Sequence, residues 1–175
     1  MEFVDLNRSF VAIANDSESN LLIGRVWGRR IGGWLEWSDL LNYPRVVLLA
    51  EAASGKTEEF RHTASALRAR GNRAFYCTIE QLADRELAAS LDPAERAALT
   101  EWKSGTEVGW FFLDSVDEAR LNRKRFEDAL RRLADDLCPA MSRACVLVSC
   151  RISDWKGNSD RLALQRLLLS SPLRW

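Results

Sequence analysis

The chain has 175 residues, of which 47% are hydrophobic, and its 25 basic residues balance 25 acidic ones. This length and apolar content suffice for one substantial core, so a single domain is the default expectation. Without a global positive charge to attract polyanions, we expect no direct nucleic-acid binding. The N-terminus carries the acidic residues Glu2 and Asp5 without a long apolar run, so we expect no ordinary secretory signal. No stretch approaches the length of a membrane span, so we expect no membrane partner.

The cysteine and histidine content argues against a zinc site. Four cysteines show no Cys-x-x-Cys pairing, and His62 is the one histidine. We therefore expect free thiols and a reducing, cytoplasmic setting. His62 falls opposite the apolar side of its expected helix and is interpreted as a surface residue.

Residues 1–43 form an apolar arm, a polar break at 15–20 and a lead-in rich in glycine and tryptophan. We expect a short helix around 36–41, stopped by Pro44. The tryptophans Trp27, Trp34 and Trp37 either pack against the core or form part of a pocket for a nucleotide base. Packing is favoured because aromatic side chains bury large areas wherever they occur.

The first expected core strand, over 45–50, runs into a segment typical of a phosphate-binding loop. Residues 50–57 read Ala-Glu-Ala-Ala-Ser-Gly-Lys-Thr, close to the pattern G-x-x-x-x-G-K-[ST]. In such loops, backbone N–H groups and a helix N-terminus face the phosphates, while the lysine binds phosphate and the hydroxyl reaches Mg²⁺. We therefore expect ATP here, with Mg²⁺ on Thr57. The expected nucleotide-binding residues are Ala52, Ala53, Ser54, Gly55, Lys56, Thr57 and Glu58.

Two alanines depart from that pattern. Ala50 stands where the pattern has glycine, and Ala53 stands where many such loops also use it. Glycine serves where the backbone needs a positive φ or a close approach to a ligand. Because alanine is the least bulky substitute, we expect the loop to form with some strain; the alternative is an ordinary strand–turn–helix.

A helix should follow the loop, since Phe60, Ala64 and Leu67 share one helical face. A strand over 73–79 comes next. A further helix, running to about residue 102, should be opened by Asp92 as its cap, Pro93 in the first turn and Glu95 as the reciprocal acid.

An apolar strand over 108–114 delivers Asp114 to its carboxyl end, where ligands of parallel sheets bind. We expect Asp114 to hold Mg²⁺ through water. Asp117 and Glu118 either orient and deprotonate an attacking water or favour the N-terminus of the next helix, and both roles are compatible.

The fourth expected strand, over 144–150, delivers Arg151 to the same edge. Its guanidinium either reads the γ-phosphate or is a surface arginine that follows a strand. Before this strand, apolar residues at helical spacing from Phe126 to Leu137 predict a helix that stops near Pro139. A last helix spans roughly 159–169. Its leucines at 162, 164, 167, 168 and 169 cover more than one face, which suggests self-association or contact with a missing domain.

Three segments in this order resemble the NACHT-type branch of the signal-transduction (STAND) ATPases: LLAEAASGKTEEF, FFLDSVDEA and VLVSCR, within residues 40–155. The resemblance implies Lys56 and Thr57 on phosphates and Mg²⁺, Asp114 as the metal-binding acid, Asp117 with Glu118 as catalytic acids, and Arg151 as the γ-phosphate sensor. Bacterial members similar to this chain are usually long proteins, often in defence against phage. Complete members have a fifth strand and a helical lid or winged-helix part, so we expect a fragment or a naturally short member.

Strands alternating with helices predict an α/β fold, a P-loop NTPase three-layer sandwich with a mostly parallel sheet of four to five strands. The expected divisions are an N-terminal lead-in at 1–43, the core at 44–158 and a C-terminal helix at 159–175. Two functions follow. One is Mg²⁺-dependent ATP binding with slow hydrolysis, acting as a switch. The other is a catalytically degenerate nucleotide-binding or interaction module that serves assembly.

Overall fold

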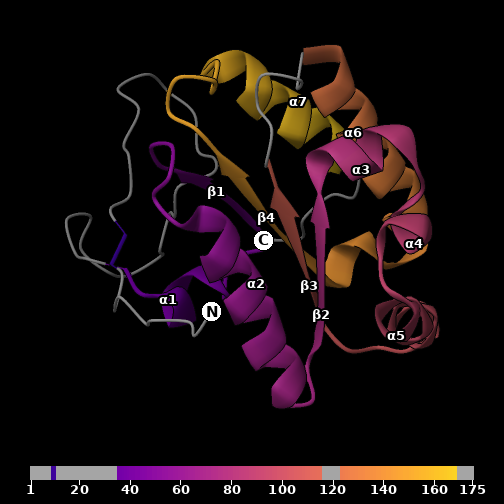
Figure 1. Ribbon diagram of the computed structural model, residues 1–175. Coiled ribbons are helices and arrows are strands. Elements are labelled where there is room, and N and C mark those ends of the chain that lie inside the picture. Colours follow the sequence, from indigo (N-terminus) through magenta and orange to yellow (C-terminus); the bar gives the residue numbers. More distant parts are fainter. Residues whose placement is uncertain (1–8, 11–34, 116–122, 169–175) are drawn as a thin grey trace.

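Four parallel strands form one sheet at the centre of the molecule (Figure 1). The computed structural model describes residues 9–10, 35–115 and 123–168. The strands lie in the order β1-β4-β3-β2. All four agree with the predicted segments to within a residue or so, which confirms the α/β class. Their bounds are β1 (Arg45–Leu49), β2 (Arg73–Thr78), β3 (Gly109–Asp114) and β4 (Ala144–Cys150).

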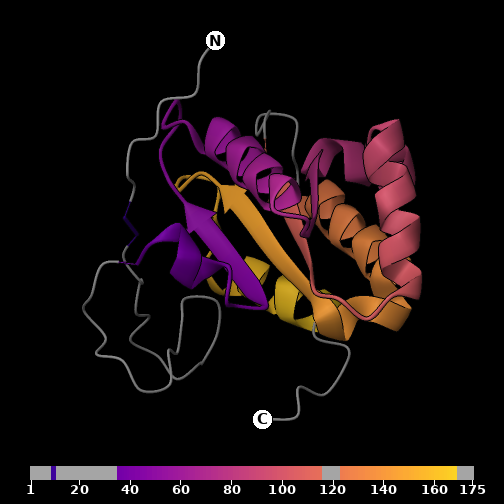
Figure 2. The same ribbon diagram turned by 90° about the horizontal axis from the view of Figure 1, so that it is seen from below.

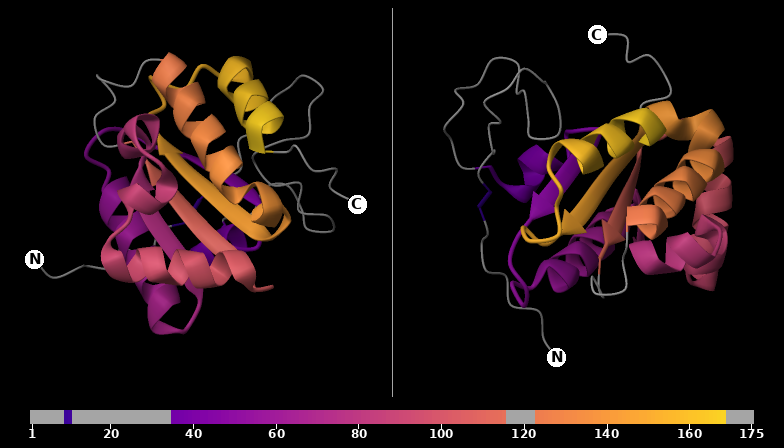
Figure 3. Two further views of the ribbon diagram at one scale, coloured as in Figure 1. Left: turned by 90° about the vertical axis from the view of Figure 1, so that its right-hand side faces the viewer. Right: turned by 90° about the horizontal axis from the view of Figure 1, so that it is seen from above.

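Helices cover both faces of the sheet, so the described part of the chain has three layers (Figure 2 and Figure 3). One face carries α1 (Trp37–Leu40) and α2 (Lys56–Ala69). The 3-10 helix η2 (Cys138–Arg143) leads into β4. The opposite face carries α3 (Ile79–Asp84), α4 (Leu87–Ser90), α5 (Pro93–Ser104), α6 (Arg123–Leu137) and α7 (Asn158–Leu168).

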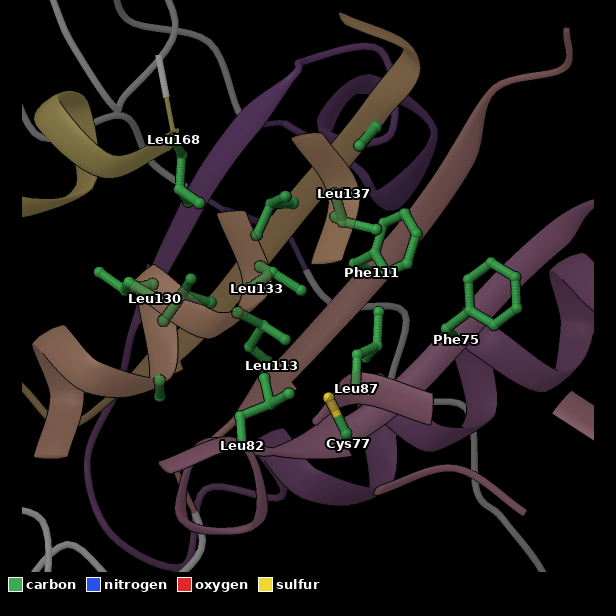
Figure 4. Packing of buried hydrophobic residues seen from close by; sticks show 14 of the residues in the cluster. Phe75, Cys77, Leu82, Leu87, Phe111, Leu113, Leu130, Leu133, Leu137 and Leu168 are labelled. Carbon is green, nitrogen blue, oxygen red and sulfur yellow. The ribbon is translucent and has the colours of Figure 1, made fainter. Parts of the chain in front are cut away.

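The strands are apolar on both sides because helices bury both faces of the sheet. In β3, Phe111 and Leu113 belong to the larger core cluster, while Phe112 belongs to the cluster under α2. Phe75 of β2 pairs in register with Phe111, and their rings stack with centroids 4.9 Å apart. Figure 4 shows part of this larger cluster. Alternation along each strand therefore decides which helix layer a side chain meets.

The C-terminal helix is part of the main core. Leu164 and Leu168 of α7 are only 3% and 1% exposed, and both lie in the larger cluster. The expectation that the leucines of this helix form an exposed associating surface is therefore wrong for these two. Leu162 is 58% exposed, whereas Leu167 packs partly against the cluster. Leu169 lies outside the described residues.

The smaller cluster joins α1 to α2. The Trp37 ring meets Phe60 edge-on, and its Nε1 donates a hydrogen bond of 3.0 Å to Glu59. Phe10 pairs with Leu35 in an isolated antiparallel bridge and also contacts the Trp37 ring. Trp37 is thus a packing residue, as favoured above. Trp27 and Trp34 lie outside the described residues.

Helix α5 begins as predicted but without its reciprocal acid. Asp92 accepts a hydrogen bond from the Glu95 N–H at 2.8 Å, whereas the Glu95 carboxylate accepts one from Arg68 of α2 at 2.5 Å. A nearby cation is a stronger partner for a carboxylate than a backbone N–H. Within the described ranges, no helix combines the length and apolar content needed to cross a membrane.

Candidate nucleotide-phosphate site

The loop between β1 and α2 follows an edge strand of the sheet and is tied to the neighbouring strand β4. The Ala50 N–H donates to the carbonyl of Cys150 at the end of β4, at 3.2 Å. Helix α2 then begins at Lys56, with Gly55 as its N-cap in the left-handed conformation at φ 85°. The N–H groups of this first turn have no partner within the helix. The loop therefore presents a helix N-terminus at the carboxyl edge of the sheet, as an anion site requires.

Backbone strain in this loop is confined to one of its two unusual alanines. Ala53 has φ 57° and is the one non-glycine residue of the described chain with a positive φ. The left-handed region costs a residue with a Cβ about 1–2 kcal/mol. Ala50 is not left-handed, so its backbone does not need the freedom of glycine. The predicted strain is confirmed at Ala53.

Lys56 folds back over the loop. Its Nζ donates hydrogen bonds to the carbonyls of Ala50 at 3.0 Å and Glu51 at 2.8 Å. Partial burial lowers the pKa of Lys56; the charge of Asp114 raises it and that of Arg151 lowers it. The fold thus brings Lys56, Asp114 and Arg151 to one edge of the sheet, which the sequence segments predicted separately.

Asp114 ends β3 and is fully buried. One carboxylate oxygen accepts a hydrogen bond of 3.0 Å from the Tyr76 hydroxyl of β2, and the other accepts one from Ser149 Oγ of β4. The Ser115 N–H in turn donates to Ser149 Oγ at 3.3 Å. Burial, and next the charge of Asp114, raise the pKa of Tyr76, so the phenol stays protonated and donates. Sequence reasoning missed the roles of Tyr76 and Ser149.

The remaining predicted loop residues line the same turn. Thr57 is half-buried in the first turn of α2, and Ser54 Oγ is buried without a hydrogen-bond partner among the described residues. Ala52 is exposed. Glu58 is exposed too and forms an ion pair of 3.2 Å with Arg61. An orphan hydroxyl in a loop of this shape fits a phosphate oxygen, because a buried polar group otherwise carries a desolvation cost.

The acids that follow β3 are not part of the described site. Asp117 and Glu118 lie outside the described residues, so the choice between catalytic and helix-capping roles stays a prediction. Arg151 directly follows β4 and is partly buried. His62 is exposed on α2, as predicted. All four cysteines are free thiols, and burial raises the pKa of Cys150 to about 11.

The residues present fit Mg²⁺ only together with a phosphate ligand. Across the described ranges, no group of three or more His, Cys, Asp and Glu side chains gathers to hold a metal ion. Mg²⁺ is usually held by one or two carboxylates together with substrate phosphates and water. Thr57 and Asp114 would supply the protein part of such a set, at the edge where the loop would hold the phosphates.

Comparisons with known proteins find distant structural likeness only. No family model and no curated protein matches the sequence. A replication initiator DnaA bound to AMPPCP and single-stranded DNA is similar over 72% of this chain and 40% of its own, with 17% identity and a TM-score of 0.47. A DNA replication initiation factor is similar over 71% and 37%, with 19% identity and a TM-score of 0.44. The chain thus spans well under half of either structure.

The chain's own geometry defines the fold. A parallel sheet with helices on both faces carries a strained, glycine-containing loop between β1 and α2, and the acid of β3 lies at the same edge. This is the arrangement of a P-loop NTPase fold.

Proposed function

We propose that this chain binds ATP with Mg²⁺ and hydrolyses it slowly as a regulatory switch. The observation that carries the proposal is the position of Lys56. Lys56 is the first residue of α2 and follows a loop in which Ala53 and Gly55 are left-handed. It also lies close enough to buried Asp114 for the two charges to interact. A cation, a helix N-terminus and a carboxylate at one sheet edge are the parts that a Mg²⁺–triphosphate requires.

For binding, the loop residues 52–58 would cradle the phosphates with their N–H groups. Lys56 already bonds two carbonyl oxygens of the loop. Phosphate oxygens carry more negative charge than carbonyls and are better acceptors for an ammonium group. Lys56 would therefore exchange these bonds for phosphate contacts, while the Thr57 hydroxyl and Asp114 would hold Mg²⁺. Bound Mg²⁺ would neutralise charge on the phosphate oxygens.

For hydrolysis, we assign Asp117 and Glu118 to the attacking water, which they would orient or deprotonate. Arg151 follows β4 on the same edge as Lys56 and would contact the γ-phosphate with paired N–H donors. Turnover would be slow, because affinity and rate in such sites come partly from closure over the base and from groups of a neighbouring domain or subunit.

The finer assignment rests on the sequence resemblance described above. We propose a NACHT-type signal-transduction ATPase in the cytoplasm, with a role in defence against phage and with no nucleic-acid ligand. The balanced charge of 25 basic and 25 acidic residues supports the last point. Protection of bacteria against phage by the intact gene, lost on Lys56→Ala, is the expected result for the defence role.

One observation favours the second function, a degenerate interaction module. Ala53 keeps a left-handed backbone that glycine would adopt without strain. Many phosphate loops of this pattern have glycine there, so the alanine favours a loop that has lost useful turnover. In this alternative the fold serves assembly, and nucleotide is bound without useful hydrolysis or not at all.

Hydrolysis measured beside binding separates the two functions. Asp117→Asn and Glu118→Gln should leave ATP affinity within about twofold and slow phosphate release at least tenfold, because orienting water matters only toward the transition state. Asp128→Asn, on the exposed side of α6, is the control and should change neither. If both variants release phosphate at the parent rate, the acids are helix caps and the interaction module gains.

A further inference from the structure

Tyr76 reaches the candidate metal site from a neighbouring strand. Thr78 of β2 pairs with Asp114 of β3, so Tyr76 lies two residues earlier on the same face of the sheet. The phenol spans that offset, and its hydroxyl donates to Asp114 Oδ2 at 3.0 Å. A shorter hydroxyl at this position would fall short of the carboxylate.

The ring of Tyr76 is also tied to the helix that carries the phosphate loop. The Arg61 guanidinium of α2 lies over the ring, with Cζ 5.2 Å from its centroid. Arg61 follows Thr57 by one helical turn and forms an ion pair with Glu58. Tyr76 therefore links the first two turns of α2 to the acid of β3.

Two hydroxyls fix the Asp114 carboxylate between them. Tyr76 bonds one oxygen and Ser149 the other, from strands on opposite sides of β3. Each carboxylate oxygen keeps a second lone-pair direction, so the carboxylate can still accept from a metal-bound water. Ser149 also accepts the Ser115 N–H, so its loss would disturb the main chain. Removing the Tyr76 hydroxyl takes one hydrogen bond from the carboxylate and leaves that main-chain contact in place.

We propose that Tyr76 is a positioning residue for Mg²⁺: its hydroxyl holds the Asp114 carboxylate in the orientation from which it receives the metal's water shell. This rests on the proposed function, because it deepens the metal part of the same site. Tyr76 touches neither nucleotide nor metal in this role. Its contribution should appear only in the Mg²⁺-dependent part of nucleotide affinity.

The test is Tyr76→Phe, with ATP affinity measured in excess Mg²⁺ and in EDTA. Affinity with Mg²⁺ should fall about tenfold, the loss of one hydrogen bond to a charged group. Affinity in EDTA should stay within twofold of the parent. Tyr43→Phe, the same change at the partly buried residue just before Pro44, is the matched control and should alter neither value.

A double variant shows whether the effect passes through Asp114. In an Asp114→Asn background, Tyr76→Phe should cause no further loss of Mg²⁺-dependent affinity, because the carboxylate that it positions is gone. Arg61→Ala offers a second route, since it loosens the ring without changing the strand. It should lower Mg²⁺-dependent affinity about threefold, the size of an exposed cation–π contact.

The outcomes distinguish this inference from the proposed function. Equal losses with Mg²⁺ and in EDTA would make Tyr76 a merely structural residue and overturn the positioning role, as would an additive loss in the double variant. If the Tyr76→Phe variant does not fold, an unchanged Mg²⁺-dependent ATP affinity in Arg61→Ala would overturn the positioning role instead. A parent chain that binds no ATP overturns the proposed function, and this inference with it.

Discussion

Charged side chains lie at both edges of the sheet, but their hydrogen-bond partners differ between the two edges. At the amino edge, the Arg143 guanidinium donates to the carbonyls of Trp102, Lys103 and Glu107 at 2.6–3.0 Å and lies 4.2 Å from the centroid of the Trp102 ring. Arg45 likewise donates to several main-chain carbonyls. These arginines tie chain segments together.

At the carboxyl edge, the charge of Lys56 is held by main-chain groups that a phosphate could replace. Lys56 bonds two carbonyls of a short loop, and that loop includes the left-handed Ala53. Strain of this kind persists at sites where the surrounding structure over-determines it, and such sites are often functional. The arginines of the amino edge therefore join chain segments, whereas we propose that the carboxyl edge binds a ligand. A variant at one edge should therefore leave the properties of the other edge unchanged.

The largest expected effect is that of Lys56→Ala on nucleotide binding. Triphosphate affinity should fall at least a hundredfold, about 3 kcal/mol, because the ammonium group bonds phosphate and contributes little to the core. Unfolding in urea should give a free energy within about 0.5 kcal/mol of the parent. Titration of a fluorescent ATP analogue measures the first quantity. Equal affinity in variant and parent would remove the phosphate-site assignment.

Arg143→Ala should have the opposite effect: it should lower the stability of the fold and leave nucleotide binding unchanged. Loss of three hydrogen bonds and the ring contact should lower the free energy of unfolding by about 2 kcal/mol. ATP affinity of the folded fraction should stay within twofold, since Arg143 lies at the opposite edge. Arg131→Ala, which removes an exposed ion pair within α6, should cost less than about 0.5 kcal/mol and serves as the control. A large affinity loss in Arg143→Ala would show that the two edges are coupled.

The smallest expected effect is a difference in fold stability between glycine substitutions at the two loop alanines, Ala50 and Ala53. Ala53→Gly should stabilise the fold slightly, because relief of the left-handed cost exceeds the added chain entropy of glycine. Ala50→Gly adds only the chain entropy of glycine, with no strain to relieve, and should therefore destabilise the fold. The two variants should differ by about 1–2 kcal/mol in urea unfolding. ATP affinity should hold or improve in Ala53→Gly; a loss of several-fold there would mean that the alanine suits a different loop shape when nucleotide binds.

The sequence predicted the helices and strands better than it predicted which side chains contact one another. Continuous apolar runs identified all four strands, because a sheet covered on both faces needs them. The short helix α3 was missed although Thr78 and Gln81 form a capping box at its start. Helical spacing alone did not show that Leu164 and Leu168 face the core while Leu162 faces solvent.

The residues of the candidate site likewise fall into two groups, those predicted from local motifs and those that only the fold brings together. Lys56, Thr57 and Asp114 belong to local motifs and were predicted from them. Tyr76 and Ser149 are 38 and 35 residues from Asp114 along the chain, and they meet it only because β3 lies between β2 and β4. Strand order is set by packing across the whole sheet, which a single motif does not contain. The sequence also marked Ala50 and Ala53 alike, whereas only Ala53 is left-handed.

Calorimetric titration of the parent chain with ATP and ADP, with and without Mg²⁺, tests the central claim most directly. A working phosphate site with a metal-binding Asp114 predicts saturable ATP binding that is weak for an isolated chain and tighter with Mg²⁺ than in EDTA. A folded sample that gives no binding heat with either nucleotide at any Mg²⁺ concentration, over a range of temperatures, would contradict the claim.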